Sequence, residues 1–181
     1  MVARAVKLDA TAPNPRDFAL DFILFEHAKH RQMCAALERL AEADTFGEGE
    51  IAELADFIRT DLAAHIADEE EALFPILQQR CDEEDHIAAT LARLDREHEV
   101  DRDLSARVCL FLLEAVATGR PPKTIVGASE ALRMFAYNQL LHMSLENAVL
   151  IPLARRRLSP TDLSDLGGRL AARRSSSRGN G

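Results

Sequence analysis

Aromatic residues are scarce in this sequence of 181 residues, which has no tryptophan, one tyrosine and 5% aromatic residues in all. β-branched residues never form the alternating apolar and polar runs that half-buried strands show, so a sheet is not expected. Alanine, leucine, glutamate and arginine dominate instead, and all four are good helix formers. The composition therefore predicts an all-α protein.

Cysteines and long apolar runs are also rare. Cys34, Cys81 and Cys109 are odd in number and widely spaced, so they provide neither a disulfide framework nor a CxxC metal or redox motif. No apolar run approaches the roughly 18 residues that a membrane-spanning helix needs, and the N-terminal stretch lacks the apolar core of a signal peptide. We therefore expect a soluble, cytoplasmic protein in a reducing compartment.

Positive charge is in the minority, and the formal net charge is −8. Nucleic acids and anionic membranes are negatively charged and bind basic surfaces, so neither is expected as a partner. The arginines at 155–157 and at 173–174 each lie near a predicted helix C-terminus, where cations suit the helix dipole. The charge pattern does not indicate a protein partner.

Proline, glycine and serine divide the chain into one helical domain with two short ends. Apolar residues recur at helical spacing over approximately 17–44, 51–79, 82–118 and 124–157, and Pro75 is expected to kink the second helix or end its regular part. Short loops favour antiparallel neighbours, so we predict an antiparallel up-down-up-down four-helix bundle over 16–158. The remaining segments are predicted as a flexible arm at 1–15, a short fifth helix at 159–174 and a disordered tail at 175–181.

The most informative feature is a repeat. A histidine is followed by a glutamate four residues later and by a proline ten residues later in two places, His65–Pro75 and His142–Pro152. A second, shorter repeat is the dipeptide Glu-His, which occurs as Glu26-His27 in the first predicted helix and as Glu97-His98 in the third. Each half of the chain therefore supplies two histidines and one glutamate, a ligand set that suits a first-row metal ion with open coordination positions.

The spacing of the repeat has a mechanical reason. Residues four apart on an α-helix lie on one face, about 6 Å apart along the axis, so histidine and glutamate reach the same centre. In an antiparallel bundle the two motifs face each other, which lets each glutamate bridge two ions while single histidines on the first and third helices complete each ion's ligands. The predicted metal ligands are His27, His65, Glu69, His98, His142 and Glu146.

Four other residues are candidates for an extra ligand or a supporting contact: His30, Glu70, Asp101 and Tyr137. His30 lies one turn from His27 and is a fifth histidine ligand, a donor to another ligand, or an exposed residue. Tyr137 is an ordinary half-buried residue or a distal hydrogen-bond donor. Taken alone, His65 or His142 would be an ordinary hydrogen-bonded core histidine, and the paired motifs favour the metal site.

On these motifs the sequence resembles the hemerythrin-like, or HHE cation-binding, family over about 17–157. The resemblance rests on Glu26-His27, Glu97-His98 and the two His-x-x-x-Glu motifs with their downstream Leu73-Phe74-Pro75 and Leu150-Ile151-Pro152. It implies a non-haem di-iron centre, with two iron ions bridged by an oxo or hydroxo group and two carboxylates, and histidines as terminal ligands. Zinc or manganese is a possible substitute, because histidine and glutamate serve all three metals.

One departure from the family pattern bears on function. Oxygen-carrying hemerythrins have two histidines one turn apart on the third helix, whereas Leu94 and Arg102 flank His98 here. Four histidines with two glutamates more closely resemble bacterial proteins tied to iron-centre repair, nitric oxide and oxidative stress, although their cysteine-bearing N-terminal segment is not found in this sequence. We therefore expect a metal-binding protein whose di-iron centre binds oxygen, nitric oxide or peroxide for sensing or stress response.

Two other functions remain open from the sequence. The same centre in an enzyme would turn over peroxide or nitric oxide, or would release iron for the repair of other iron centres. A ferritin-like oxidase is disfavoured, because only Glu83-x-x-His86 matches the Glu-x-x-His motif of such sites, and it lies at a helix start.

Overall fold

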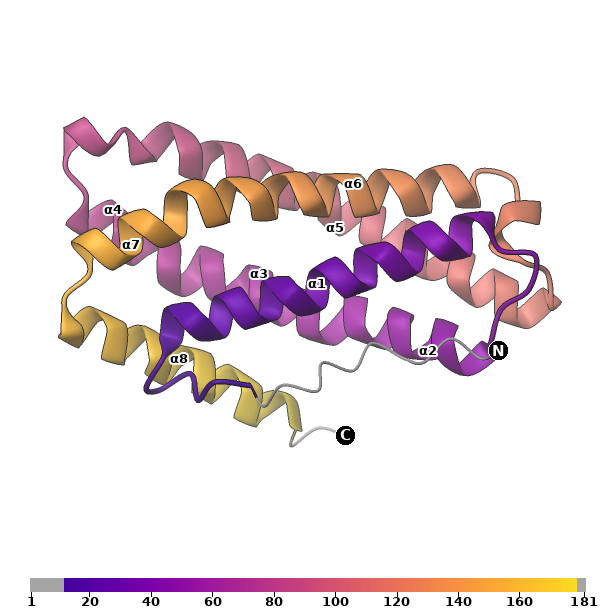
Figure 1. The fold of residues 1–181 in the computed structure, drawn as a ribbon, viewed down its shortest axis with the longest axis horizontal. Helices are drawn as coiled ribbons and strands as arrows, with labels where there is room; N and C mark the ends of the chain where they lie inside the picture. Colours follow the sequence, from indigo (N-terminus) through magenta and orange to yellow (C-terminus); the bar gives the residue numbers. More distant parts are fainter. Residues whose placement is uncertain (1–11, 179–181) are drawn as a thin grey trace.

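Four long helical segments lie side by side in the computed structural model, which describes residues 12–178 (Figure 1). Within that range every regular element is helical and no strand is present, so the predicted all-α class is confirmed. The first segment is α1 (Ala19–Glu42) and the third is α5 (Ile87–Thr118). The second consists of α2 (Glu48–Phe57), α3 (Ala63–Asp68) and α4 (Phe74–Arg80), and the fourth of α6 (Ala128–Leu145) and α7 (Ile151–Arg157), followed by α8 (Pro160–Arg178).

The second and fourth segments are interrupted by π turns, in which each N–H bonds to the carbonyl five residues back. One turn, Glu69–Leu73, joins α3 to α4, and another, Glu146–Leu150, joins α6 to α7. Pro75 and Pro152 follow directly and lack the N–H that a continuous α-helix requires, so each lies in the first turn of a new helix. The expected interruption at Pro75 is therefore present. A third π turn, Ile58–Leu62, has no proline to explain it.

Two of the predicted helix starts are wrong. The acidic residues expected to open the third helix form a 3-10 turn, Glu83–Asp85, and His86 in the left-handed region (φ 50°) separates that turn from α5. The fourth helix begins at Ala128 rather than near residue 124, because Pro122–Thr124 is another 3-10 turn and Gly127 adopts φ 81°. Glycine adopts this left-handed conformation without a steric penalty, so Gly127 can end the connection and stand directly before the new helix.

The core has two apolar regions with a buried polar layer between them. Along α1, Ile23 belongs to one region and Met33 and Leu37 belong to the other, while His27 and His30 between them are also buried. Buried charged or polar groups cost free energy unless they are paired, so a layer of this kind in the middle of a bundle indicates a functional site. No helix of the described chain is long and apolar enough to cross a membrane.

Helix α8 packs against α1 and α3 and is held at both ends (Figure 1). Its predicted cap is present, since Asp162 accepts a hydrogen bond from the Ser159 backbone N–H (3.0 Å) and Ser159 Oγ accepts one from the Asp162 N–H (3.2 Å). The helix extends to Arg178, so the tail predicted to be disordered from residue 175 is helical as far as 178. Ser175 Oγ donates to the carbonyl of Ala171 (3.0 Å), a hydrogen bond within the C-terminal part of α8.

The predicted N-terminal arm lies mostly outside the described residues, and its described end is not free. The Asn14 carbonyl accepts hydrogen bonds from the N–H groups of Asp17 and Phe18, which form a turn before α1. Pro15 lies so close to α8 that a Cβ added at Gly167 would stand 2.2 Å from the Pro15 carbonyl oxygen. The arm predicted for residues 1–15 is therefore packed against α8 at least at Pro15.

Candidate metal centre

The six predicted ligands meet in the buried polar layer, and each of the four long segments contributes to them. His27 comes from α1, His98 from α5, and the two His-x-x-x-Glu motifs end where the π turns begin. All six side chains are buried, with exposed fractions of 0–4%. Their ligand atoms form two groups, within each of which all atoms lie within 4.8 Å of one another: His27, His65, Glu69 and Glu146, and His98, His142 and Glu146.

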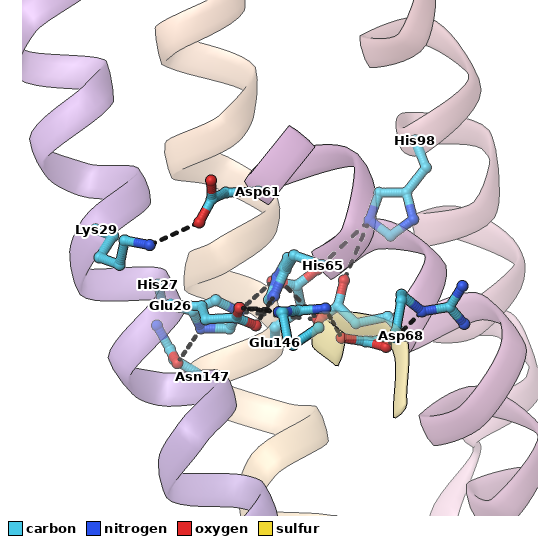
Figure 2. A network of polar contacts seen from close by, with 12 residues as sticks. Glu26, His27, Lys29, Asp61, His65, Asp68, His98, Glu146 and Asn147 are labelled. Carbon is cyan, nitrogen blue, oxygen red and sulfur yellow. Dashed lines mark hydrogen bonds and ion pairs between the residues drawn. The ribbon is translucent and has the colours of Figure 1, made fainter. Parts of the chain in front are cut away.

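The first group is built around His27 and His65. His27 Nε2 lies 3.4 Å from Glu146 Oε2 and 3.8 Å from Glu69 Oε1, and His65 Nε2 lies 3.5 Å from Glu69 Oε1. Figure 2 shows these side chains converging, with His98 approaching from another helix. Two ligands bonded to one ion at ~2.1 Å stand about 3.0 Å apart at a right angle and about 3.4 Å apart at a tetrahedral angle. The gaps therefore suit an ion better than direct hydrogen bonds.

His98, in the second group, faces the other oxygen of both glutamates, although only Glu146 is a member of that group. His98 Nε2 lies 3.6 Å from Glu69 Oε2 and 3.7 Å from Glu146 Oε1. Glu69 and Glu146 thus each turn one oxygen toward the His27 side and the second oxygen toward His98. This is the arrangement that a carboxylate adopts when it is shared between two cation positions.

Several polar atoms at the centre have no hydrogen-bond partner although they are buried. They are the Nε2 atoms of His27 and His98 and both carboxylate oxygens of Glu69 and Glu146. Buried polar atoms without partners are rare in native proteins, and here six of them point at one another. Imidazole nitrogens and carboxylate oxygens are ligands for first-row metal ions, so the residues present fit a cation.

The outward-facing Nδ1 atom of each of the four predicted histidine ligands has a side-chain oxygen close to it. The contacts are His27 to Asn147 Oδ1 (2.9 Å), His65 to Glu26 Oε2 (3.1 Å), His98 to Glu70 Oε1 (3.1 Å) and His142 to Asp101 Oδ2 (3.1 Å). Because each partner is an acceptor, the proton is held on Nδ1 and the lone pair of Nε2 faces the centre. Such partners fix the tautomer and the ring orientation of a metal-binding histidine.

Two of these supporting residues, Glu70 and Asp101, are among the sequence candidates, and the structure places both outside the two ligand groups. Asp101 is buried and accepts a second hydrogen bond from Gln139 Nε2 (2.8 Å). Sequence reasoning missed the roles of Glu26 and Asn147. A signal existed for Asn147, because it follows Glu146 just as Glu70 follows Glu69.

The other two candidates lie apart from the ligand groups. His30 is buried, with its ring centroid 4.5 Å from that of His65 in a T-shaped arrangement, yet it belongs to neither group and its Nδ1 has no hydrogen-bond partner. The Tyr137 side chain is on the surface with 60% of its area exposed. A hydrogen bond from Tyr137 to a ligand at the centre is therefore excluded in this structure.

The two glutamates differ in their acidity. Burial raises the pKa of Glu69 well above its ordinary value, and the nearby charge of Glu146 acts in the same direction. Burial also acts to raise the pKa of Glu146, but contacts with His98, His142 and His27 outweigh it and lower that pKa to about 2. Two carboxylates facing each other in a dry core resist double ionisation, and a cation between them removes that conflict.

The histidines of the two groups also differ. Burial lowers the pKa of His65 well below its ordinary value, and the neighbouring His27 contributes. For His98 burial acts in the same direction, but the carboxylates of Glu146 and Glu69 outweigh it and raise the pKa. Metal ions bind neutral imidazole, so His65 itself can bind a cation without losing a proton.

Comparison with known proteins identifies the family. A model of the hemerythrin HHE cation-binding domain matches residues 19–154, a range that includes all six residues at the centre and ends before α8. A search of curated proteins finds no match. The matched range covers most of the chain, and its residues form a buried cluster of histidine and glutamate able to hold metal ions. The chain belongs to the hemerythrin HHE cation-binding domain family.

Proposed function

We propose that this protein holds two iron ions at the buried centre and binds oxygen, nitric oxide or peroxide there, for sensing or stress response. The observation that carries the proposal is the sharing of Glu69 and Glu146 between the two histidine groups, with one oxygen of each turned to either side. Iron bound by nitrogen and oxygen ligands supplies redox chemistry and open coordination positions for small ligands. An antiparallel up-down-up-down order of the four long segments belongs to the same proposal, and the short connections between them support it.

The ligand count leaves room for a small molecule. His27 and His65 with one oxygen from each glutamate would give four ligands at the first position. At the second position His98, His142 and Glu146 would give three, and Glu69 Oε2, which lies 3.6 Å from His98 Nε2, would be a fourth. Six-coordinate iron would retain open positions with this set. Leu94, one of the two residues one turn from His98 on α5, is fully buried and supplies no ligand atom. This favours sensing or scavenging over oxygen carriage.

The walls around the centre suit a small, uncharged ligand. The ring of Phe74 is stacked on that of His98, with centroids 6.0 Å apart and an interplanar angle of 14°, and Leu73 and Leu150 are fully buried nearby in the same apolar region. Apolar side chains exclude water and charged molecules and strengthen the electrostatic interactions within the site. Such walls favour small, uncharged ligands over large or charged ones.

Metal analysis tests the centre itself. Protein purified under reducing conditions is expected to contain nearly two iron ions per chain and to show oxo-to-iron charge-transfer bands in air. His65→Ala and His142→Ala should each lower the iron content, whereas His86→Ala, at an exposed position, should not. A metal-free protein that both substitutions leave unchanged would contradict the proposal. Zinc or manganese in place of iron would retain the cation site and reject the assignment of iron.

The alternatives are separated by mixing the reduced iron protein with oxygen, nitric oxide or peroxide. Spectral changes that reverse without consumption of the ligand support binding, and multiple turnovers support an enzyme. Transfer of iron to an acceptor protein with a damaged iron centre would support a role as iron donor. A cytoplasmic location, and the absence of nucleic-acid and membrane partners, remain predictions from the sequence.

A further inference from the structure

We propose that α8 supports the metal centre. Its residue Arg174 positions Glu26 and, through Glu26, the candidate ligand His65. The proposal rests on cation binding at the centre and is independent of which ion is bound. The family match ends at residue 154, so this role lies outside the matched domain. Arg174 touches no ion position and acts only through the residues that it holds.

The contacts form a chain from α8 to the centre. Arg174 donates to Glu26 Oε1 from Nη2 (2.5 Å) and from Nε (3.2 Å). The second oxygen of the same carboxylate, Oε2, lies 3.1 Å from His65 Nδ1, and His65 Nε2 faces the centre. Glu26 is 4% exposed, so Arg174 and His65 replace the water that would otherwise hold its carboxylate.

Arg174 also reaches a second buried carboxylate. Its Nη1 lies 2.7 Å from Asp68 Oδ2, while Arg173 Nε donates to Asp68 Oδ1 at 2.7 Å. Asp68 is fully buried and stands directly before Glu69. One guanidinium therefore joins α1, which carries Glu26, to the end of α3, which carries His65, at the level of the cation positions.

The geometry leaves Glu26 another orientation if Arg174 is removed. Glu26 and Arg174 line one wall of an open cleft of about 640 Å³, together with Lys29 and Asp61. An unpaired carboxylate in the core is costly, so Glu26 is expected to turn toward this cleft and its water. His65 would then lose the acceptor on Nδ1, and its ring would lose its fixed orientation.

A comparable relay exists on the other side of the centre, but it does not involve α8. Glu70 accepts from His98 Nδ1 and pairs with Arg102, which lies on α5 one turn after His98 itself. The partners of His27 and His142 are an amide and a carboxylate held by amides. Among the contacts that residues 12–178 make with the four histidines, only those of His65 lead to a residue beyond the four long segments.

The proposal links the docking of α8 to cation binding. If Arg174 helps to set His65 for the ion, the bound ion must in turn stabilise the docked helix, because coupling between two equilibria is reciprocal. A helix that merely adds stability to the bundle would share only the general protection that cation binding gives to all folded segments, without a specific response to Arg174. Loss of a group that orients a ligand typically weakens metal affinity by about 10–100-fold, and the more remote Arg174 is expected at the lower end of that range.

The test uses the full-length metal-free protein with Zn²⁺ as the probe. Arg174→Met should weaken Zn²⁺ binding about 10-fold in competition with a chromophoric chelator, and Arg174→Lys should recover part of the loss through its charge. In wild type, Zn²⁺ should slow hydrogen exchange of the α8 backbone amides, and Arg174→Met should abolish this effect. The matched control is Arg80→Met, which breaks the contact of Arg80 with Asp162 at the start of α8, far from the centre, and should leave the Zn²⁺ affinity unchanged.

The outcomes separate the possible failures. If Arg174→Met is folded and binds Zn²⁺ as tightly as wild type, or if Arg80→Met weakens binding equally, the positioning role is overturned. If wild type itself binds no Zn²⁺, cation binding fails and the inference fails with it. Should Arg174→Met not fold, Glu26→Gln is compared with the double variant, which has no unpaired carboxylate at position 26. The role of Arg174 then predicts that its removal has little further effect on Zn²⁺ affinity once Glu26→Gln is present, and a further loss of about 10-fold would refute it.

Discussion

Replacing Glu69 with glutamine should stabilise the metal-free protein and weaken metal binding at the same time. Both carboxylate oxygens of Glu69 are buried without a hydrogen-bond partner, and the nearest nitrogens lie 3.5–3.8 Å away. The adjacent carboxylate of Glu146 repels a charge there, which is one reason why the pKa of Glu69 is raised. Glutamine has the same shape, carries no charge and can donate its amide to Glu146.

The magnitude follows from the cost of a buried, unsatisfied polar group. Such a group costs about 1–3 kcal/mol, and more when charged. In a domain of this size 1 kcal/mol shifts Tm by roughly 2–4 °C, so a gain of about 2 kcal/mol corresponds to roughly 4–8 °C. The size of the effect depends on pH. Because the folded-state pKa of Glu69 is raised, its destabilising effect is absent below the ordinary carboxyl value of about 4.5, grows as pH rises from that value toward the raised one, and is fully present above the raised value.

The assay is thermal unfolding of metal-free wild type and Glu69→Gln at pH 4 and pH 7.5, followed by Zn²⁺ titration. Glu69→Gln should have a higher Tm than wild type at pH 7.5, and the difference in Tm should be smaller at pH 4. It should also weaken Zn²⁺ binding by more than the ~10–100-fold that is lost when a residue that only orients a ligand is replaced. Glu53→Gln, at an exposed position of α2, is the matched control and should change neither property. Equal or lower stability of metal-free Glu69→Gln at pH 7.5 would refute the reasoning.

Three further predictions concern packing and protons. Phe135→Ala, at a fully buried position, should lower the free energy of unfolding in urea by about 3–5 kcal/mol. Gly167→Ala should destabilise the protein by about 1–3 kcal/mol, because its Cβ would lie 2.2 Å from the Pro15 carbonyl, whereas Gly168→Ala meets nothing within 4 Å and should gain up to ~1 kcal/mol of helix propensity. Zn²⁺ affinity should rise with pH while Glu69 loses its proton, and calorimetry in buffers of different ionisation enthalpy should detect the proton released on binding.

Each of these three predictions has an outcome that would contradict it. Phe18→Ala removes a phenyl ring that is 56% exposed, so a loss as large as that of Phe135→Ala would show that burial does not determine the cost. Equal effects of alanine at positions 167 and 168 would contradict the close approach of the N-terminal segment to α8. Zinc binding that releases no proton at any pH between 4 and 8 would show that Glu69 is already ionised in the metal-free protein.

Much of the fold and of the candidate centre could be predicted because the signals are local. A histidine and a glutamate four residues apart share a helix face whatever the rest of the chain does, and the repeat of that spacing pointed to the residues that the structure brings together. Helical periodicity likewise identified the long segments. The end of the last helix was missed because serine at 175–177 is a weak helix former, and the tertiary docking of α8 through Leu166 and Leu170 overrides that preference.

The supporting contacts could not be predicted, because they join residues that are far apart in the sequence. Glu26 and His65 are 39 residues apart, and Arg174 and Glu26 are 148 apart. Periodicity shows which face of a helix is buried but not which carboxylate meets which histidine. Glu26-His27 and Glu97-His98 look equivalent in the sequence, yet Glu26 supports a ligand while Glu97 pairs with Arg93 on its own helix.

The π turns after the two His-x-x-x-Glu motifs have a consequence for engineering. A π turn contains one residue more than the hydrogen-bonded loop of an α-helix, so it rotates the following helix by about 100° relative to an uninterrupted one. Glu69 faces the centre at the start of one such turn, and the orientation of Leu73 and Leu77 in the apolar region below it already includes this offset. Grafting only the ligands onto straight, idealised helices would therefore preserve the spacing of each motif and misalign the scaffold below it. A transplant of this centre should carry the whole stretch from the histidine through the downstream proline, as a single cassette.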